Sequence, residues 1–420
     1  MSEALRFTFV VSRYGETILG GAEAHCREVA ERLAARGHDV RVLTTCSRSY
    51  RTWSNELPAG ASELHGVRVE RHPVRLGRVR PLDEITKRVA SRLRGSRRLG
   101  QLWAWMQGPY APGLLQRVRE EGRDRDAVVF FSLLLLQTFL GLKQARERSV
   151  LVPLVHDEPP TYTRVAREAL SQPRAIIANT EEELERIRSI VAGPMPPAAI
   201  VALGLDSPAP RDPSWEPPTR APYLLVIGRL AKSRPMLRVW HALQSMGGLP
   251  PLELAHGERV PWSEVRLVTV GERSKIYEGV RNVIQLDFVD ESLRSQLLWN
   301  STALVNPSRY ESLSLVLLEA WQCSVPVAVN ARCDVTVGQC RRSGGGVVLD
   351  FDRPEEGARQ IAVGLRASEE RKRMAEGGRR YTEQRYRWDR VLDAYEVVAR
   401  SLREGVELES SLRGWESGAR

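Results

Sequence analysis

Two series of alternating strand-like and helix-like segments, separated by a proline-rich stretch, constrain the fold of this 420-residue chain most strongly. The strand-like segments of the first series are apolar runs rich in Val, Leu and Phe, at residues 7–11, 40–44, 127–131, 150–155, 175–178 and 200–203. The second series follows the prolines and has its strand-like runs at residues 223–228, 264–271, 282–289 and 302–308. Strands that alternate with helices predict parallel sheets covered by helices on both faces.

The proline-rich stretch at residues 207–222 predicts a linker between two domains. Its prolines, which exclude a continuous helix or a central strand, are Pro208, Pro210, Pro213, Pro217, Pro218 and Pro222. We therefore predict two Rossmann-like, doubly wound α/β domains, at residues 1–206 and 223–387, that face each other across a cleft. A helix at residues 388–404 is expected to pack back toward the first domain, and residues 405–420 to form a flexible tail.

Charge and cysteine content narrow the class of protein and its location. A formal net charge of +10 predicts attraction to polyanions such as nucleotide diphosphates, nucleic acid or an anionic membrane face. The five cysteines include no C-x-x-C pair, which argues against a disulfide framework and against a zinc site. The N-terminus has the pattern of a first strand instead of a signal peptide, and the longest apolar stretch, at residues 127–142, is shorter than the ~20 residues that span a bilayer. We therefore expect a cytoplasmic protein that is at most peripheral to a membrane.

The strongest chemical signal is a pair of glutamates, Glu311 and Glu319, between two apolar strands. We expect Glu311 in the loop before a helix and Glu319 two turns inside that helix. The backbone N–H groups of Ser312, Leu313 and Ser314 would then open the helix and bind a phosphate. Glu311 would reach sugar hydroxyls in front of the phosphate, and Glu319 would accept hydrogen bonds from ribose hydroxyls. The alternative is a surface helix whose two glutamates are only solvated.

This segment, with its flanking strands, resembles the donor-site signature of glycosyltransferase family 4, whose members are retaining enzymes of the GT-B fold. Family members commonly read P-S-x-x-E-G-F-G-L-x-x-L-E-A-M-A-x-G-x-P-V. The chain matches that signature at Pro307, Ser308, Glu311, Leu315, Leu318, Glu319, Ala320, Pro326 and Val327. It departs from the signature at Ser312 and Ser314, where glycines are usual. A serine adds a side chain where the backbone approaches phosphate, although its hydroxyl can donate a hydrogen bond.

A second match to the family follows the strand-like run at residues 223–228. Family members usually continue from this strand through Gly-Arg to a Lys-Gly, and both basic groups hold the diphosphate. Gly228 and Arg229 fit that pattern. A gapless alignment places Arg234 at the lysine position, and Lys232 is the competing candidate, so the second phosphate contact stays open between them. The alternative for this segment is an ordinary solvated basic loop.

Two further segments of the first half resemble the family. Gly20 and Gly21 correspond to a glycine-rich loop after the first strand, where the backbone comes close to a ligand phosphate or to the acceptor. The loop is not G-x-G-x-x-G, which argues against a nicotinamide dinucleotide. His156 follows a strand-like run, and family members carry a histidine there, close to the transferred sugar. Without these other matches, a tight turn and a structural histidine would be the ordinary interpretations.

Residues 68–106 form a basic segment that no match to the family explains. Arginines and lysines are frequent over residues 68–98, and Leu82, Ile85, Val89 and Leu93 recur at helical spacing. Tryptophans follow at Trp103 and Trp105. The sequence leaves two interpretations open, a peripheral contact with an anionic membrane and a solvated surface helix. We do not expect nucleic acid as a partner.

Together these resemblances imply a retaining glycosyltransferase of polysaccharide or glycoconjugate biosynthesis, with its donor in the second domain and its acceptor in the first. The donor substrate would be a nucleotide diphosphate sugar, and neither a separate cofactor nor a metal would be needed. Glu311, His156 and Arg229 would be the catalytic residues, with Arg229 stabilising the departing phosphate. The acceptor could be a glycan, a lipid-linked sugar or a small molecule. Two alternatives stay open, a catalytically silent nucleotide-sugar-binding protein and a GT-B-type nucleotide-sugar epimerase.

Overall fold

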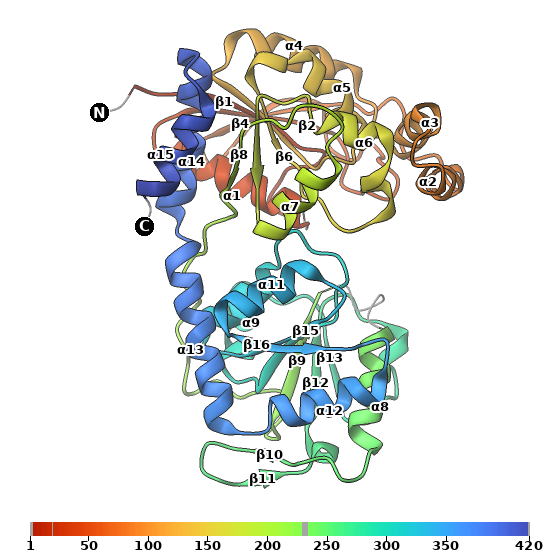
Figure 1. The fold of residues 1–420 in the computed structure, drawn as a ribbon, viewed down its shortest axis with the longest axis vertical. Coiled ribbons are helices and arrows are strands. Elements are labelled where there is room, and N and C mark those ends of the chain that lie inside the picture. Colours follow the sequence, from red (N-terminus) through yellow and green to blue (C-terminus); the bar gives the residue numbers. More distant parts are fainter. Residues whose placement is uncertain (1–2, 19, 229–233, 419–420) are drawn as a thin grey trace. The chain divides into compact units, whose positions relative to one another are not determined.

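The computed structural model describes residues 3–18, 20–228 and 234–418, which form two compact units. Unit 1 comprises Met1–Gly204 and Trp388–Arg420, and unit 2 comprises Leu205–Arg387. Each unit is built around its own sheet (Figure 1). The prediction of mixed α/β structure with parallel sheets is confirmed. None of the helices in these described ranges is long and apolar enough to cross a bilayer.

Unit 1 contains an eight-stranded sheet with the order β3-β4-β2-β1-β5-β6-β7-β8. Its strands are β1 Arg6–Val10, β2 Asp39–Thr45, β3 Gly60–Leu64, β4 Val67–His72, β5 Ala127–Phe131, β6 Ser149–Val152, β7 Ala175–Ala178 and β8 Ala198–Ile200. Neighbouring strands are parallel except at the edge, where β3 runs antiparallel to β4. The strands that follow β1 in the chain are added first on one side of it, as β2 to β4, and then on the other, as β5 to β8. The switch point of this sheet therefore lies between β1 and β5.

Helices cover both faces of this sheet, which explains why β1, β2 and β5 are buried along almost their whole length. The helices are α1 Gly21–Ala35, α2 Leu82–Arg92, α3 Arg97–Gln107, α4 Pro112–Asp124, α5 Leu136–Gln144, α6 Arg164–Ala169, α7 Glu181–Ile190, α14 Trp388–Glu404 and α15 Leu408–Gly418, with 3-10 turns at Arg146–Arg148 and Pro159–Tyr162. In β1, Phe9 lies with its ring centroid 6.2 Å from that of Tyr395 in α14. Its neighbour Val10 points to the opposite face, into the core formed with α4 and α5.

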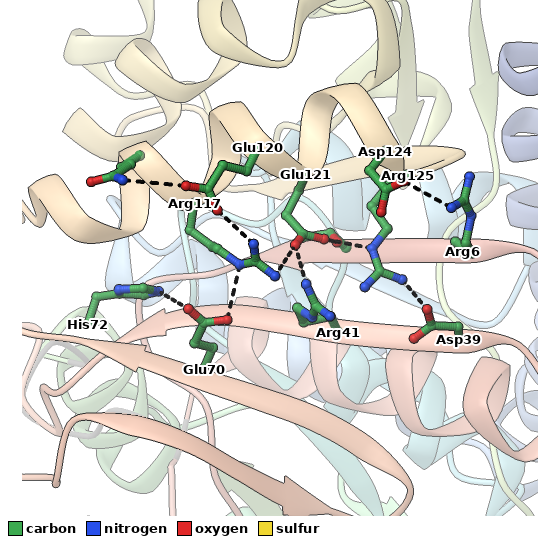
Figure 2. A network of polar contacts seen from close by, with 12 residues as sticks. Arg6, Asp39, Arg41, Glu70, His72, Arg117, Glu120, Glu121, Asp124 and Arg125 are labelled. Atoms are coloured by element: carbon green, nitrogen blue, oxygen red, sulfur yellow. Dashed lines mark hydrogen bonds and ion pairs between the residues drawn. The ribbon is translucent and has the colours of Figure 1, made fainter.

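A buried charged network ties α4 to the strands below it (Figure 2). Glu121 of α4 is only 3% exposed and accepts a hydrogen bond from the hydroxyl of Thr8 at 2.6 Å. Its carboxylate also contacts three guanidinium groups, those of Arg117 and Arg125 at 2.7 Å each and that of Arg41. A buried carboxylate is tolerated only when it is paired and hydrogen-bonded, and Glu121 meets both conditions.

Unit 2 contains a six-stranded parallel sheet with the order β13-β12-β9-β14-β15-β16. Its strands are β9 Tyr223–Ile227, β12 Arg266–Val270, β13 Val283–Leu286, β14 Ala303–Asn306, β15 Val327–Asn330 and β16 Gly346–Leu349, and a separate hairpin pairs β10 Leu252–Glu253 with β11 Arg259–Val260. Its helices are α8 Arg234–Ser245, α9 Glu291–Trp299, α10 Leu315–Gln322, α11 Asp334–Ser343, α12 Pro354–Gly364 and α13 Ser368–Arg385, with 3-10 turns at Trp262–Glu264 and Lys275–Tyr277. The switch point of this sheet lies between β9 and β14.

The proline-rich stretch expected as a linker lies against α9 of unit 2. The backbone N–H of Asp212 donates to the side-chain oxygen of Gln296 at 3.0 Å. The indole N–H of Trp299 donates to the carbonyl oxygen of Ala209, also at 3.0 Å. Prolines keep the segment extended and leave its polar groups without strand partners, so side chains of α9 supply those partners instead.

The end of the chain differs from the expected flexible tail. Residues Leu408–Gly418 form α15, and Leu408 and Leu412 are buried. These two leucines are one helical turn apart, so both point to the same side of α15. α15 packs against α14 and β8 of unit 1, which provides the apolar surface that the last residues lack by themselves.

Candidate functional site

The strand order of unit 2 places side by side the two strands that precede the expected donor-binding segments. β9 pairs directly with β14 in parallel, so the carboxyl ends of these strands lie at the same edge of the sheet. Gly228 follows β9 with a φ of +135°, and its N–H donates to the carbonyl oxygen of Val270 at 2.9 Å. Arg229 and Lys232 lie outside the described residues.

Arg234 lies at the first position of α8, and its side chain is exposed. Pro235, which stands where family members usually have glycine, is the second residue of that helix. The first turn of a helix tolerates proline because its N–H has no partner within the helix. The departure from the family pattern therefore leaves α8 intact and keeps Arg234 at its start.

The loop between β14 and α10 is held in place by two buried asparagines. Asn306 closes β14; its side-chain oxygen accepts from the N–H of Ser308 at 2.9 Å, and its amide donates to the hydroxyl of Ser314 at 2.8 Å. Asn330 closes β15 and donates to the carbonyl oxygen of Pro307 at 2.9 Å. Neither asparagine was among the expected site residues. The signal for both was a polar residue that ends an otherwise apolar strand.

Glu311 lies in this loop, and the helix begins later than expected. Ser314 is the N-cap of α10, with an extended backbone, and Leu315 is the first helical residue. The amides of Ser312, Leu313 and Ser314 therefore do not open the helix, because the Asn306 contact keeps Ser314 in the loop. The N–H groups at the start of α10 are those of the residues that follow Ser314.

The two serines that replace the usual glycines have buried side chains. Ser312 is 8% exposed and Ser314 is 2% exposed. Since the hydroxyl of Ser314 accepts a hydrogen bond from Asn306, that side chain is directed into unit 2. The added atoms at Ser314 therefore do not stand on the solvent side of the loop, where a phosphate would approach.

Glu319 is the fifth residue of α10, little more than one turn inside the helix instead of the expected two. A carboxylate oxygen of Glu319 lies 3.0 Å from Nε of Arg294 in α9. Burial raises the pKa of Glu319, and the charge of Arg294 opposes that effect. Arg294 was not among the expected site residues, because nothing in the local pattern relates α9 to α10.

In unit 1, His156 lies in the loop after β6, and a buried glutamate holds that loop. One carboxylate oxygen of Glu183 accepts from the N–H of Val155 at 2.6 Å, and the other accepts from the N–H of Asn179 at 2.7 Å. Burial raises the pKa of Glu183 to about 7. Glu183 also stands three residues after Thr180, whose hydroxyl accepts from the Glu183 N–H at 3.2 Å. This capping pattern in the sequence was the signal that could have identified Glu183.

Gly20, the first glycine of the pair after β1, packs against an ion pair. A Cβ atom on Gly20 would lie 2.2 Å from a carboxylate oxygen of Glu23, whereas a Cβ atom on Gly21 would meet nothing within 4 Å. Glu23 contacts Arg13 at 2.6 Å, and both side chains are largely buried. Close packing against Glu23 thus gives Gly20 a structural role, and the approach of the backbone to a ligand at this loop stays a prediction. Arg13, which follows β1 at the switch point of the sheet, is a further site candidate that the motifs missed.

In the described part of the chain, no group of three or more His, Cys, Asp or Glu side chains is arranged to hold a metal ion. The expected site residues are thus distributed over two units. Unit 2 holds Glu311, Glu319 and Arg234 at the ends of neighbouring strands and their helices. Unit 1 holds His156 and the glycine pair at the corresponding edge of its own sheet.

Comparisons with known proteins agree with this architecture. The model of the glycosyl transferase 4-like domain matches residues 20–206, and the model of the glycosyl transferases group 1 matches residues 213–381. D-inositol 3-phosphate glycosyltransferase of Jonesia denitrificans is 28% identical over 279 residues, which cover 59% of this chain and 64% of that protein. The chain thus matches somewhat less than two thirds of that relative.

Solved structures resemble the whole chain. Sucrose-phosphate synthase from Thermosynechococcus elongatus has a TM-score of 0.68 at 15% sequence identity, over 96% of this chain and 100% of that one. The HepE protein of Anabaena, solved in complex with UDP and glucose, has a TM-score of 0.62 at 15% identity, over 94% of this chain and 100% of that one. With both halves matched in order by the two family models, the chain belongs to the group 1 glycosyltransferases and has the GT-B fold.

Proposed function

We propose that this protein is a retaining glycosyltransferase that transfers a sugar from a nucleoside diphosphate sugar to an acceptor hydroxyl. The observation that carries the proposal is the pairing of β9 with β14, which brings Gly228, just after β9, to the same edge of the sheet as the loop that contains Glu311. The bond between the anomeric carbon and the diphosphate oxygen breaks, and the acceptor oxygen bonds to the same face of the sugar. The hydroxyl proton passes to the leaving diphosphate.

Cationic side chains and helix N-termini neutralise the leaving diphosphate in this proposal. Arg234 occupies the first turn of α8, where the helix dipole disfavours a positive charge. A diphosphate bound at that position makes the same charge favourable, because phosphate is attracted both to the guanidinium and to the free N–H groups of the helix. Arg229 and either Lys232 or Arg234 provide the cations. With that charge available, we propose that transfer proceeds without a metal ion.

Glu311 and Glu319 are assigned to the two sugars of the donor. Glu311, in the loop before α10, orients the transferred sugar through its hydroxyls. Glu319 accepts hydrogen bonds from the ribose hydroxyls. Arg294 contacts one oxygen of Glu319, and a carboxylate offers about four acceptor positions, so sites for the ribose remain.

Unit 1 provides His156 and binds the acceptor in this proposal. The HepE structure contains UDP and glucose, which supports a nucleotide-sugar donor for this chain as well. The relative from Jonesia suggests phosphorylated cyclic polyols as the first acceptors to test. All five cysteines are buried free thiols, which supports a reducing, cytoplasmic location.

The test is to incubate the purified protein with a panel of UDP, GDP and ADP sugars, with and without inositol phosphates and other acceptors. We expect one donor to release nucleoside diphosphate faster when an acceptor is present, and the product to retain the anomeric configuration of the donor by NMR. Addition of EDTA should leave the rate unchanged. An inverted product would contradict retention.

The same assay separates the two alternatives. A silent binding protein would bind nucleoside diphosphate by calorimetry but release none from any donor. An epimerase would convert the donor sugar in the absence of acceptor. Either outcome would replace the proposed transfer reaction.

A further inference from the structure

Helix α2 exposes the side that carries its large apolar residues and buries the side that carries Asp83. Leu82, Ile85 and Val89 are 47%, 51% and 39% exposed, whereas Asp83 and Ala90 are buried. On a helical projection the three apolar residues fall within about 60° of one another. An ordinary surface helix turns such a stripe toward the core, so the orientation of α2 is the reverse of the usual one.

A buried ion pair fixes that orientation. The carboxylate of Asp83 lies 3.5 Å from Nε of Arg78, in the segment that leads into α2, and the side chain of Asp83 is 4% exposed. Rotation of α2 to bury its apolar stripe would expose Asp83 and break its contact with Arg78. The exposure of Leu82, Ile85 and Val89 is therefore built into the packing of α2 on unit 1.

Helix α3 packs beside α2 and adds further exposed apolar groups (Figure 1). Leu93, just after α2, is 56% exposed, and Leu102 in α3 is 45% exposed. Trp105 is 37% exposed, with its ring centroid 4.9 Å from that of Tyr110. We call the surface formed by residues 82–105 the α2–α3 surface.

The α2–α3 surface is also strongly basic. Arg88 and Arg92 of α2 are exposed. On the helical projection they lie about 60° and about 20° from Ile85, the nearest member of the apolar stripe. Within the described ranges, neither of them forms an ion pair. Arg97 of α3 pairs with Glu168 at 3.0 Å. Glu84 is the only exposed acidic residue of α2, so this helix presents a clear excess of positive charge.

We propose that the α2–α3 surface binds the interface of an anionic lipid bilayer. An apolar stripe flanked by arginines matches such an interface, because the stripe enters the acyl boundary while the guanidinium groups contact lipid phosphates. A second copy of this chain would bring two positive surfaces together, which charge repulsion opposes. Nucleic acid would attract the arginines but offers no apolar layer to cover the stripe. The observations thus favour a membrane over both other partners.

The experiment measures flotation of the full chain with vesicles of phosphatidylcholine alone or mixed with phosphatidylglycerol. We expect binding to the anionic vesicles only, and weaker binding as salt is added. Two variants test the two components of the surface, Ile85→Ser with Val89→Ser, and Arg88→Gln with Arg92→Gln. Each pair should reduce binding at least about tenfold without lowering the melting temperature, since all four side chains are exposed.

Matched controls carry the same changes on unit 2. Val363→Ser removes an apolar group that is 67% exposed, and Arg366→Gln with Arg380→Gln removes two exposed charges. These variants should bind the anionic vesicles like the wild type. Absence of vesicle binding, equal binding to neutral vesicles, or a dimer that Ile85→Ser dissociates would each overturn the proposal.

Discussion

Arg294 of α9 and Glu319 of α10 form an ion pair at 3.0 Å, at the residue assigned to the ribose of the donor. Burial raises the pKa of Glu319 above its ordinary value, and the charge of Arg294 opposes part of that rise. The pair therefore favours the ionised form of Glu319, which accepts hydrogen bonds at both oxygens. It joins two helices that follow different strands of the same sheet.

Replacement of Arg294 by methionine should make donor binding depend on pH. Without the guanidinium the pKa of Glu319 rises further, so the carboxylate is protonated at a higher pH and loses acceptor capacity. Calorimetric titration with the nucleoside diphosphate across pH should show affinity lost at a higher pH in Arg294→Met than in the wild type. Glu319→Gln, which has no carboxylate, should bind weakly at every pH. Identical pH profiles for Arg294→Met and wild type would show that the pair does not serve donor binding.

Glu311→Gln should lower the rate of transfer by about 100-fold, because misplacement of the reacting sugar is costly even when the donor stays bound. The melting temperature should hardly change, since Glu311 lies in a loop. The rate of nucleoside diphosphate release measures the effect. Glu376→Gln, on the exposed side of α13, is the matched control and should keep full activity. Full activity in Glu311→Gln would remove this residue from the site.

Glu183→Gln should destabilise the protein by about 1–3 kcal/mol and lower activity through the His156 loop. The glutamine amide has one acceptor oxygen and one NH2 donor, so the N–H of Val155 or of Asn179 loses its acceptor. Glu185→Gln, on the exposed side of α7, should be close to wild type in both respects. Chemical unfolding and the transfer assay measure the two effects, and an active, fully stable Glu183→Gln would refute the positioning role.

The pKa of Glu183 also predicts the pH dependence of stability. Its folded value of about 7 exceeds the ordinary value of 4.5, so between these values the folded state holds more protons than the unfolded state. The contribution of this group to the unfolding free energy therefore falls as pH rises from 4.5 to 7. The difference in stability between wild type and Glu183→Gln should shrink over that interval. A constant difference would contradict the raised pKa.

Glu121→Gln should destabilise unit 1 by about 3–5 kcal/mol, because the arginines around it lose their shared counter-charge in a buried position. Burial by itself raises the pKa of Glu121, but the hydrogen bond from Thr8 and the charges of Arg125 and Arg41 outweigh that effect. The pKa of Glu121 is therefore lower than its ordinary value. The stabilising contribution of the wild-type carboxylate is therefore present at neutral pH and lost as pH falls below the ordinary value. Glu120→Gln, at the exposed neighbouring position, should change the unfolding curve little.

Gly20→Ala and Gly21→Ala should differ although the residues are adjacent. The added methyl group at position 20 displaces the carboxylate of Glu23 and disturbs its pairing with Arg13, which should cost about 1–2 kcal/mol. At position 21 the methyl group meets open space and favours the helix, so stability should stay equal or rise. Thermal unfolding of the two variants provides the comparison, and equal losses would contradict the packing argument.

The sequence by itself determined the two alternating α/β units and the order of the motifs, because strand and helix patterns are short-range and repeat along each element. It also placed Glu311 in the loop before a helix. It could not locate the start of α10, since Ser314 is held outside the helix by the side chain of Asn306.

Only the tertiary structure decided which distant residues meet. The pairing of β9 with β14, the contact of Arg294 with Glu319 and the anchoring of the His156 loop by Glu183 each join segments that no local pattern relates. The orientation of α2 was likewise undecided, because its spacing fits either a buried or an exposed stripe until the burial of Asp83 is known. The tail was expected to be flexible because its own sequence shows no periodicity, whereas α15 packs on the neighbouring α14 and on β8, a strand that is distant in the sequence. Such contacts depend on how the whole chain packs. They determine which side chains surround the site residues that the motifs identify.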